Sequence, residues 1–381
     1  MKKTGIITFH NSHNCGSMLQ ALALQEKLSE YCGTDVTMID FSNEGQVNLY
    51  SIFPKVKSFK GLVKNLMFLP YYKTLQKQQN DYIKFIDNFN LSKDHYSTSS
   101  ELSSLNGKYD YWVCGSDQVW NTKCPDADDA YFLNFVQEGK KIAYAPSFGG
   151  ADIAKVVDDI DKYVQYFNSL DSISIRESNG KRWLENLIDR EVPLIADPTI
   201  LLTKEEWMKY ALPGRVIEGD YIFYYAFHYS KEQNEMVKEI AKKLGVKVVS
   251  MDVKTWIIRG LKKYDVQLSP EFGPAAFLNI VANSSMILTR SFHGAVFSTL
   301  FEKKFWMLGK ISTDPNKDDR AYSVLKQLGL ENRGITIEDI KNGRDVLEPI
   351  DYSKVLEKHQ YMRDKAKAYL QNAYNCAKSE G

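Results

Sequence analysis

The amino-acid sequence predicts an α/β protein with two domains, each built around a doubly wound, mostly parallel sheet. Short apolar strands alternate with amphipathic helices in both halves of the chain, and parallel strands need such crossover helices. The length of 381 residues favours two domains over one. The pattern stops at Leu212-Pro213-Gly214 and then restarts, and Pro-Gly marks a break in regular structure. We therefore expect an N-terminal domain over residues 1–212, a C-terminal domain over residues 213–345 and a helical tail over residues 346–381.

In the N-terminal half, the first expected strand covers residues 4–9 and a polar loop follows it. A helix is expected from Ser17, because Ser17 and Gln20 have the spacing of a capping box and apolar residues then recur at helical period. Thr203 and Glu206 have the same spacing and predict a short helix near the domain boundary. The other expected strands of this half cover residues 36–41, 109–114, 141–145 and 172–176.

The C-terminal half repeats the β/α construction. Pro274 suits the first turn of a helix, and Gly329 suits the residue that closes one. The expected strands cover residues 221–227, 246–251, 286–289 and 305–308. The expected helices cover residues 231–244, 274–282 and 322–328, with one more from Ala295 and a long charged helix from Tyr352.

Charge and composition exclude several classes of protein. The chain carries 49 Lys and Arg against 48 Asp and Glu, and this balance lacks the basic excess of a nucleic-acid binder. A hydrophobic fraction of 44% argues against a disordered or low-complexity chain. The five cysteines are odd in number and none lies in a C-x-x-C motif, so we expect neither a disulfide framework nor a zinc ribbon.

The N-terminus and the apolar segments bear on the location of the protein. The start, Met-Lys-Lys-Thr-Gly-Ile-Ile-Thr-Phe-His, becomes polar too early for the core of a signal peptide. No apolar run reaches the roughly 18–20 residues that a membrane span needs. We therefore expect a cytoplasmic protein.

Four loops follow expected strand ends and carry polar side chains. Ligands of open α/β sheets bind beyond the carboxyl ends of the strands, so these loops form the candidate site. Three of them precede a helix, whose free N–H groups and dipole favour a bound anion. The four loops cover residues 10–17, 115–121, 176–178 and 290–294.

The motifs in these loops resemble those of the polysaccharide pyruvyl transferase family. Gly115-Ser116-Asp117-Gln118-Val119-Trp120-Asn121 corresponds to the G-S-D-Q-x-W-N signature of that family. The strongest C-terminal match is Ser291-Phe292-His293-Gly294-Ala295-Val296-Phe297-Ser298. Further matches, in family order, are Asn14-Cys15-Gly16, Ser174-Ile175-Arg176-Glu177, Asp197-Pro198-Thr199 and Asp319-Arg320. Each motif alone is weakly specific, but the ordered set is specific.

The resemblance implies a GT-B-like fold, in which two Rossmann-like domains face a cleft and a C-terminal helix packs back on them. It implies a transferase that moves pyruvate from phosphoenolpyruvate onto two hydroxyls of a cell-surface glycan or its precursor, as in exopolysaccharide biosynthesis. The product is a cyclic ketal, and phosphate is released. The implied partners are phosphoenolpyruvate as co-substrate and a glycan acceptor, with no further cofactor, no metal and no nucleic acid.

The charge of phosphoenolpyruvate guides the assignment of site residues. Its carboxylate and phosphate need several cations or N–H donors. Addition of a sugar oxygen to the enol carbon also needs an acid for the methylene carbon and a base for the hydroxyl proton. We assign the acid, or the donor to the departing phosphate, to His293 and the base to Asp117. The candidate donor-binding residues are Arg176, Arg290, Ser291, Gly294 and Arg320, and the candidate acceptor or loop residues are Asn14, Gly16, Ser116, Gln118, Trp120 and Asn121.

One position departs from the family pattern. Many relatives have Arg-x-His-Gly, whereas this chain has Ser291 at the Arg position and Arg290 one residue earlier. Adjacent side chains on a strand point to opposite faces, so Arg290 replaces that Arg only where the strand has ended or twisted. A Ser-Phe-His-Gly subgroup exists within the family, and the sequence leaves open whether its donor is phosphoenolpyruvate.

Structural roles compete with functional ones at several positions. Asp117 also suits the cap of a turn, and Trp120 also suits a packed aromatic of the core. Arg176 with Glu177 also suits a surface ion pair, and Arg320 a solvated helix start. Two further groups suggest metal ligands but fit no metal site well; they are His10, His13 and Cys15, and the acidic turn of Asp126, Asp128 and Asp129.

The segment from Lys55 to Lys77 is rich in Lys, Leu and Phe and contains no acidic residue. One interpretation is a helical excursion whose Lys head groups lie in water over buried stems. The other is peripheral contact with an anionic membrane at its inner face, which suits an acceptor on a lipid carrier.

Two other functions stay open. A GT-B-type glycosyltransferase with a nucleotide-sugar donor needs a group for the ribose, and Glu271 in Pro-Glu-Phe-Gly-Pro is the obvious candidate. The other is a non-catalytic glycan-binding relative, which Ser291 in place of Arg favours. The intact polar residues Asn14, Asp117, Arg176 and His293 count against this second function.

Overall fold

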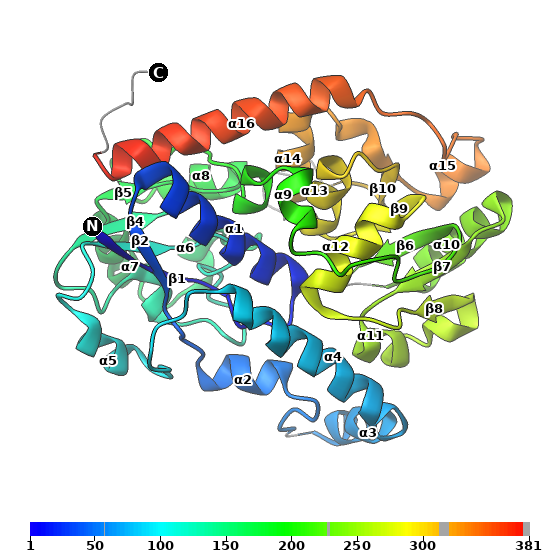
Figure 1. The fold of residues 1–381 in the computed structure, drawn as a ribbon, viewed down its shortest axis with the longest axis horizontal. Coiled ribbons are helices and arrows are strands. Elements are labelled where there is room, and N and C mark those ends of the chain that lie inside the picture. Colours follow the sequence, from blue (N-terminus) through cyan, green and yellow to red (C-terminus); the bar gives the residue numbers. More distant parts are fainter. Residues whose placement is uncertain (57, 227–228, 312–319, 376–381) are drawn as a thin grey trace.

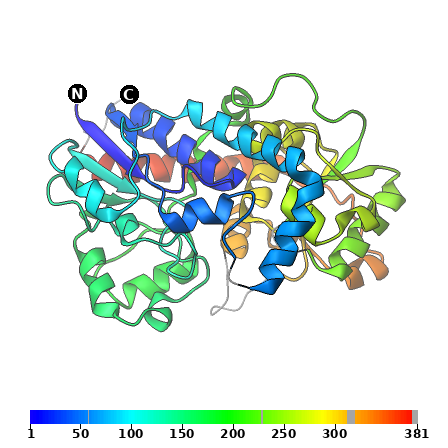
Figure 2. The same cartoon turned by 90° about the horizontal axis from the view of Figure 1, so that it is seen from below.

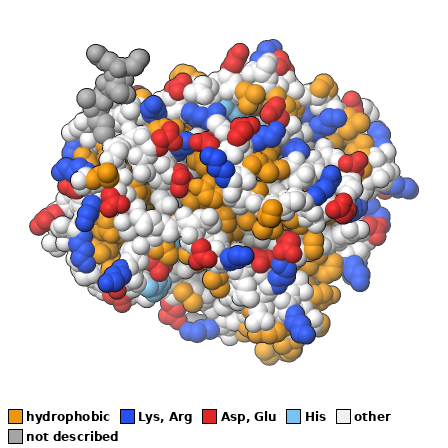
Figure 3. Space-filling model, in the orientation of Figure 1, with side chains coloured by type: hydrophobic (Ala, Val, Ile, Leu, Met, Phe, Trp, Pro, Cys, Tyr) orange, Lys and Arg blue, Asp and Glu red, His pale blue; other side chains and the backbone are white. Residues whose placement is uncertain are grey.

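The computed structural model describes residues 1–56, 58–226, 229–311 and 320–375, and it contains two β-sheets side by side with helices around them (Figure 1). Every pairing between named strands of the described residues is parallel. The predicted α/β class with two parallel sheets is therefore confirmed. The visible face carries acidic and basic side chains interspersed, in keeping with the balanced charge (Figure 3).

The N-terminal sheet has five strands in the order β2-β1-β3-β4-β5. The strand order reverses between β1 and β3, because β2 is added on one side of β1 and β3 on the other. Open α/β sheets bind ligands at such a reversal point. Most residues of these strands are buried, as expected of a parallel sheet covered on both faces. The strands are β1 (Lys3–Ile7), β2 (Asp35–Met38), β3 (Tyr111–Cys114), β4 (Lys140–Ala143) and β5 (Ser172–Ile173).

The C-terminal sheet has six strands in the order β11-β10-β9-β6-β7-β8. Its reversal point lies between β6 and β9, so the loops after these strands are its expected ligand side. The expected strands at 286–289 and 305–308 match the structure, and residue 227 of another lies outside the described residues. The strands are β6 (Tyr221–Tyr225), β7 (Lys247–Ser250), β8 (Val266–Leu268), β9 (Met286–Thr289), β10 (Phe305–Leu308) and β11 (Gly334–Ile335).

The helices connect the strands and cover the sheets. None of the helices within the described residues is both long and apolar enough to cross a membrane. The helices of the N-terminal half are α1 (Cys15–Cys32), α2 (Glu44–Tyr50), α3 (Phe59–Phe68), α4 (Tyr72–Phe85), α5 (Ser99–Leu102), α6 (Ile153–Val156), α7 (Ile160–Asn168), α8 (Ser178–Glu185) and α9 (Lys204–Met208). Those of the C-terminal half are α10 (Lys231–Leu244), α11 (Val253–Ile258), α12 (Gly273–Asn283), α13 (Phe292–Leu300), α14 (Arg320–Leu328), α15 (Ile337–Lys341) and α16 (Tyr352–Ala373).

Helix α1 begins at Cys15, so the predicted capping box at Ser17 is wrong. The side chain of Asn14 caps the helix and accepts hydrogen bonds from the N–H groups of Gly16 at 3.0 Å and Ser17 at 3.4 Å. The hydroxyl of Ser17 donates to Asp117 and is not available to the helix end. The tertiary partner of Ser17 therefore overrides its local capping preference.

Helix α13 also begins earlier than expected, at Phe292 and not at Ala295. Ser291 caps it by accepting a hydrogen bond from the N–H of Gly294 at 3.2 Å. His293 therefore lies in the first turn of a helix and not in a loop.

Helix α16 lies across both halves of the molecule (Figure 1). The hydroxyl of Tyr369 donates to the carbonyl oxygen of Ala143 in β4 at 2.8 Å. His359 Nε2 lies 3.1 Å from Thr299 Oγ1 in α13. The predicted C-terminal helix that packs back on the two halves is therefore confirmed.

Helices α3 and α4 reach from the N-terminal half onto the C-terminal half (Figure 2). The N–H of Phe272, just before α12, donates to Asp81 Oδ2 at 3.2 Å. Lys254 Nζ of α11 donates to the carbonyl oxygen of Ser51 at 2.5 Å. A boundary at residue 212 thus divides the two sheets but not all of their helices, and the boundary itself stays a prediction.

Candidate active site

His293, after β9, and Gly16, after β1, bring the two reversal points of the sheets into contact. A β-carbon built on Gly16 would overlap the imidazole, so the ring lies directly against the backbone of α1. The N-cap of α13 and the N-cap of α1 fix the two sides of this contact. The site is therefore built at the junction of the two sheets, where the strand-end rule places it.

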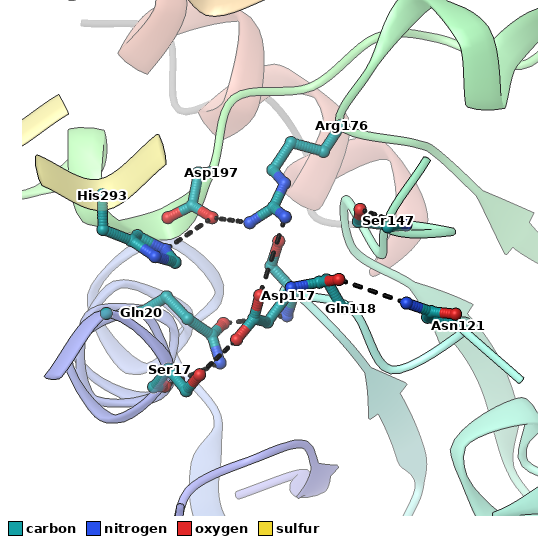
Figure 4. A network of polar contacts seen from close by, with 12 residues as sticks. Ser17, Gln20, Asp117, Gln118, Asn121, Ser147, Arg176, Asp197 and His293 are labelled. Carbon is teal, nitrogen blue, oxygen red and sulfur yellow. Dashed lines mark hydrogen bonds and ion pairs between the residues drawn. The ribbon is translucent and has the colours of Figure 1, made fainter. Parts of the chain in front are cut away.

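Asp197 lies at the centre of a buried polar network (Figure 4). Its Oδ2 lies 2.6 Å from Arg176 Nη1 and 3.5 Å from His293 Nε2. Its Oδ1 accepts hydrogen bonds from the N–H of Thr199 at 3.0 Å and from the hydroxyl of the same residue at 2.7 Å. One carboxylate thus holds a guanidinium of the N-terminal half beside an imidazole of the C-terminal half.

Asp117 continues the network on the other side of Arg176. Its Oδ1 lies 3.6 Å from Arg176 Nη2, and its Oδ2 accepts a hydrogen bond from Ser17. Its φ of 63° is left-handed, a conformation that Asp tolerates better than most residues. The N–H of Ser116 donates to Gln20 Oε1 at 3.0 Å, so α1 also fixes the backbone of this loop.

The network is closed off from solvent. Asp117, Arg176, Asp197 and His293 are all less than a tenth exposed. Burial opposes the charge of Asp197, but His293, Arg176 and the N–H of Thr199 outweigh it and lower the pKa of Asp197 well below its usual range. Among the described residues, Arg176 Nε, Arg176 Nη2 and His293 Nε2 have no hydrogen-bond partner. Each of these three atoms faces a carboxylate oxygen at 3.5–3.8 Å, of Glu177, Asp117 and Asp197 respectively.

Glu177 lies next to Arg176, but its pKa is shifted in the opposite direction to that of Asp197. Its Oε1 accepts a hydrogen bond from the N–H of Phe148 at 2.9 Å, and its Oε2 lies 3.8 Å from Arg176 Nε. Burial raises the pKa of Glu177 to about 7, and the charges of Arg176 and Arg320 offset this only in part. The interpretation of Arg176 and Glu177 as a surface ion pair is wrong, because both side chains are buried.

A cavity of about 180 Å³ lies beside this network, and Phe292 lines it. The guanidinium carbon of Arg176 lies 4.4 Å from the centre of the Phe292 ring. The cavity wall carries three cations, Arg290, Lys310 and Arg320. Arg290 follows β9 and Lys310 follows the adjacent β10, so parallel pairing places both at one edge of the sheet. We call this the cationic cavity, and its charge suits a small anion.

A larger cavity of about 330 Å³ lies next to Asn14, between α2, α4 and the ends of β6 and β7. The ring of His13 stacks on Tyr82 at 5.1 Å and lies 5.4 Å from the ring of Tyr50. Burial and the charge of Lys254 lower the pKa of His13 to about 4, so its ring is neutral at pH 7. We call this the aromatic cavity, because aromatic faces beside polar groups line it, as in many small-molecule sites.

The loop after β3 contributes fewer site residues than the sequence predicted. Trp120 is buried in the core and its Nε1 donates to the carbonyl oxygen of Tyr131 at 3.1 Å, so the structure supports its packing role and not a sugar platform. Gln118 and Asn121 bond to each other at 3.2 Å at the edge of the network (Figure 4). Ser116 is fully buried, and its hydroxyl donates to a backbone carbonyl.

The structure separates the two arginines that the sequence grouped as one anion clamp. Arg176 is buried in the network, whereas Arg290 is exposed and lines the cationic cavity together with Arg320. Strand β9 ends at Thr289, so Arg290 lies outside the strand, and the rule that adjacent side chains point to opposite faces does not apply to it. Gly294 packs against Thr289, where a β-carbon would overlap the side chain. Asp319 of the last motif lies outside the described residues.

Sequence reasoning did not assign Asp197, Phe292 or Lys310 to the site. A signal existed for Asp197, because Asp197-Pro198-Thr199 follows an apolar segment and matches a family motif. Lys310 has no local signal, since only the pairing of β10 with β9 brings it near Arg290.

The sequence groups that suggested metal ligands have other partners. His10 Nε2 lies 3.2 Å from Asp40 Oδ1, and Cys15 Sγ lies 3.2 Å from the hydroxyl of Tyr82. Asp126 is buried and not solvated as expected, and burial raises its pKa to about 6. Across the part of the chain that the structure describes, no group of three or more His, Cys, Asp or Glu side chains gathers as metal ligands would.

Comparison with solved structures supports the fold. A UDP-N-acetylglucosamine 2-epimerase is 14% identical, with a TM-score of 0.54 over 100% of this chain and 99% of that chain. The UDP-GlcNAc 2-epimerase from Neisseria meningitidis bound to UDP-GlcNAc is 12% identical, with a TM-score of 0.47 over 98% of each chain. The UDP-GlcNAc 2-epimerase from Methanocaldococcus jannaschii is 11% identical, with a TM-score of 0.46 over 96% of this chain and 93% of that chain. The fold is GT-B-like, as the first of these similarities shows.

Comparison of sequences places the chain in a family. No curated protein matches it. The family model described as polysaccharide pyruvyl transferase matches residues 14–309, which is more than half of the chain and includes strands of both sheets and the whole buried network. The chain therefore belongs to the polysaccharide pyruvyl transferase family, which is a family of transferases.

Proposed function

We propose that this protein transfers pyruvate from phosphoenolpyruvate onto two hydroxyls of a glycan acceptor, forming a cyclic ketal and releasing phosphate. The observation that carries the proposal is the buried Asp197 carboxylate that joins His293 and Arg176 beside a cavity with three cations. Membership of the family supports the same chemistry.

The cationic cavity is the proposed donor site. Phosphoenolpyruvate carries a carboxylate and a phosphate, and Arg pairs with either group through two parallel hydrogen bonds. Arg290, Lys310 and Arg320 supply a matching positive charge, and Phe292 supplies an apolar wall for the enol carbons. The N-terminus of α13 adds its dipole, which favours an anion at this end.

The aromatic cavity is the proposed acceptor site. Polar side chains line it together with the flat faces of His13, Tyr50 and Tyr82. This combination suits a sugar ring with its hydroxyls. Asn14 lines this cavity, and Gly16 two residues later contacts His293. The proposed reacting groups thus lie between the two cavities.

The residues of the network supply the proton transfers. The oxygen of one acceptor hydroxyl bonds to C2 of phosphoenolpyruvate, its proton passes to Asp117, and the imidazolium of His293 protonates C3. The second hydroxyl oxygen then bonds to C2 as the C2–O bond to phosphate breaks, and its proton returns to His293. The electron pair of the C2–O bond leaves with the phosphate, which takes up the proton held by Asp117 and is stabilised by the arginines. Asp197 orients the imidazole and stabilises its charged form.

Glu271, the candidate ribose ligand for a nucleotide-sugar donor, has another partner in the structure. Glu271 Oε2 lies 2.5 Å from Lys77 Nζ, so this carboxylate is part of an ion pair between α4 and the loop before α12. The donor experiment below still separates the two donors.

The test incubates the purified chain with phosphoenolpyruvate and a panel of sugar acceptors, and follows phosphate release and the acceptor mass. We expect phosphate release that depends on the acceptor, together with a pyruvylated product. Thermal stabilisation by nucleoside diphosphates but not by phosphoenolpyruvate would support the nucleotide-sugar enzyme instead. Glycan binding without turnover with either donor would support the non-catalytic relative.

A further inference from the structure

The segment around α3 exposes apolar side chains that soluble proteins normally bury. Phe59 is 80% exposed, Leu62 49%, Leu66 55% and Leu69 55%. Most of the large hydrophobic residues that are exposed in the described chain fall between residues 47 and 72. A contiguous exposed apolar patch of this kind marks an interaction site.

Helix α3 presents this patch on a single face. Phe59, Leu62, Val63 and Leu66 recur at intervals of three and four residues, so they share one side of the helix. Phe68, which alone in this helix is buried, follows Phe59 by about two and a half turns and so lies on the opposite side. Phe68 anchors the helix to the protein, and the apolar face points outward.

Basic residues border the patch, and acidic ones are missing from it. Lys60 and Lys64 lie one turn apart on α3, and Lys73 lies in the first turn of α4; all three are exposed. The sequence has no Asp or Glu between residues 51 and 80. Within the described residues, no carboxylate forms an ion pair with these three lysines, whereas Lys55 pairs with Glu44 at 2.8 Å. Figure 3 shows hydrophobic side chains with a basic group beside them at the lower edge, where α3 lies in Figure 1.

The patch is continuous with the rim of the aromatic cavity. Leu49 is 39% exposed and also lines the cavity, as does Ile52. The ring of Phe53 stacks on Tyr72 at 6.0 Å, which ties the loop before α3 to the start of α4. The surface that carries the patch therefore leads directly to the proposed acceptor site.

We propose that residues 47–56 and 58–72 dock on the surface of a bilayer that contains anionic lipids. Phe59, Leu62 and Leu66 insert among the acyl chains while Lys60 and Lys64 meet the head groups, as in amphipathic helices that lie in the interface. Lys is depleted at protein–protein interfaces, so its position around the patch favours a lipid surface over a second protein. Docking here turns the aromatic cavity toward the membrane and toward an acceptor held on a lipid carrier; this last step rests on the proposed function.

The test is co-sedimentation of the full chain with vesicles of phosphatidylcholine, with and without phosphatidylglycerol. Two variants probe the patch: Phe59→Ser with Leu66→Ser, and Lys60→Gln with Lys64→Gln. The matched control is Tyr361→Ser with Lys365→Gln on α16, an exposed aromatic and an exposed lysine at the opposite edge of the molecule (Figure 1). Thermal denaturation checks that each variant folds, and the substituted side chains are exposed, so we expect unchanged melting temperatures.

We expect the wild type and the control to bind vesicles with phosphatidylglycerol, and binding to weaken with salt. Loss of two lysines should lower the partition coefficient about thirty-fold. Wild-type protein that stays in the supernatant, or patch variants that bind like the control, would overturn the proposal. So would concentration-dependent dimerisation that Phe59→Ser abolishes, because a second copy would then be the occupant.

A second measurement keeps this proposal separate from the proposed function. The patch variants should turn over a soluble acceptor with phosphoenolpyruvate at the wild-type rate, because none of the substituted residues lines either cavity. Vesicle binding without any pyruvyl transfer would overturn the proposed function and leave the docking surface intact.

Discussion

The imidazole of His293 lies against the backbone of Gly16, and no β-carbon fits between them. Gly16 lies in the first turn of α1 and needs no left-handed backbone, so glycine is required there for space and not for its φ angle. This contact links α1, which follows the first strand of the N-terminal sheet, to the first turn of α13, and it fixes the distance between His293 and the N-terminal half.

Gly16→Ala should displace His293 and lower kcat about 100-fold, the usual cost of misplacing a reacting group by about 1 Å. Alanine is a better helix former than glycine by about 1 kcal/mol, so α1 itself should stay intact. The measurement is kcat for pyruvyl transfer together with circular dichroism. Ser29→Ala at the exposed far end of α1 is the control, and a Gly16→Ala enzyme with unchanged kcat would show that the contact is not catalytically important.

Asp197→Asn should destabilise the protein by about 3 kcal/mol, because it leaves the buried charge of Arg176 without its counter-ion. The folded-state pKa of Asp197 is depressed, so its stabilisation is fully present above the unfolded pKa of about 3.9 and is lost as the pH falls toward the folded value. Urea denaturation at pH 7 measures the loss. The control is Asp189→Asn, which is exposed; equal stability of the two variants would contradict the prediction.

Glu177→Gln should remove part of the pH dependence of stability. The folded pKa of Glu177 is raised to about 7 from 4.5, so between these values the folded state keeps a proton that the unfolded chain has lost. Stability should therefore fall as the pH rises from 4.5 to about 7, by at most about 3 kcal/mol.

The free energy of unfolding of Glu177→Gln, measured between pH 4 and pH 8, should be flatter than that of the wild type. Glu191→Gln, at an exposed position, serves as control and should follow the wild type. Parallel curves for Glu177→Gln and the wild type would mean that Glu177 is ionised in the folded state.

Alanine at Arg290, Lys310 or Arg320 should raise KM for phosphoenolpyruvate about 10- to 100-fold, because each change removes a charge-assisted hydrogen bond of about 1.5–3 kcal/mol. KM for the acceptor should change little. Lys326→Ala, an exposed lysine on the same helix as Arg320, is the control. If all four variants share one KM for phosphoenolpyruvate, the donor does not bind in the cationic cavity.

His13→Ala should raise KM for the acceptor and leave KM for phosphoenolpyruvate unchanged, since it removes an aromatic face from the aromatic cavity. Loss of such a face should cost about tenfold, in line with about 0.5–1.5 kcal/mol for an aromatic pair. The histidine control is His95→Ala, which lies outside both cavities. A rise in KM for phosphoenolpyruvate alone would mean that the donor, and not the acceptor, binds in the aromatic cavity.

Local sequence signals located most elements of this fold. Helix 231–244 and strands 286–289 and 305–308 match α10, β9 and β10, because period and capping are local properties. The capping box of Thr203 and Glu206 is also confirmed. The capping box at Ser17 failed because its hydroxyl has a partner in another loop, which local spacing does not reveal.

By itself, the sequence determined the α/β class, the family and the loops that carry the chemistry, since each depends on short motifs in a fixed order. Only the tertiary structure decided that Asp197 joins Arg176 to His293, that Lys310 lies with Arg290, and that the apolar face of α3 points outward. These relations depend on strand order and on the packing of one sheet against the other. No local pattern records them, because side chains that meet across a fold come from segments with independent local preferences.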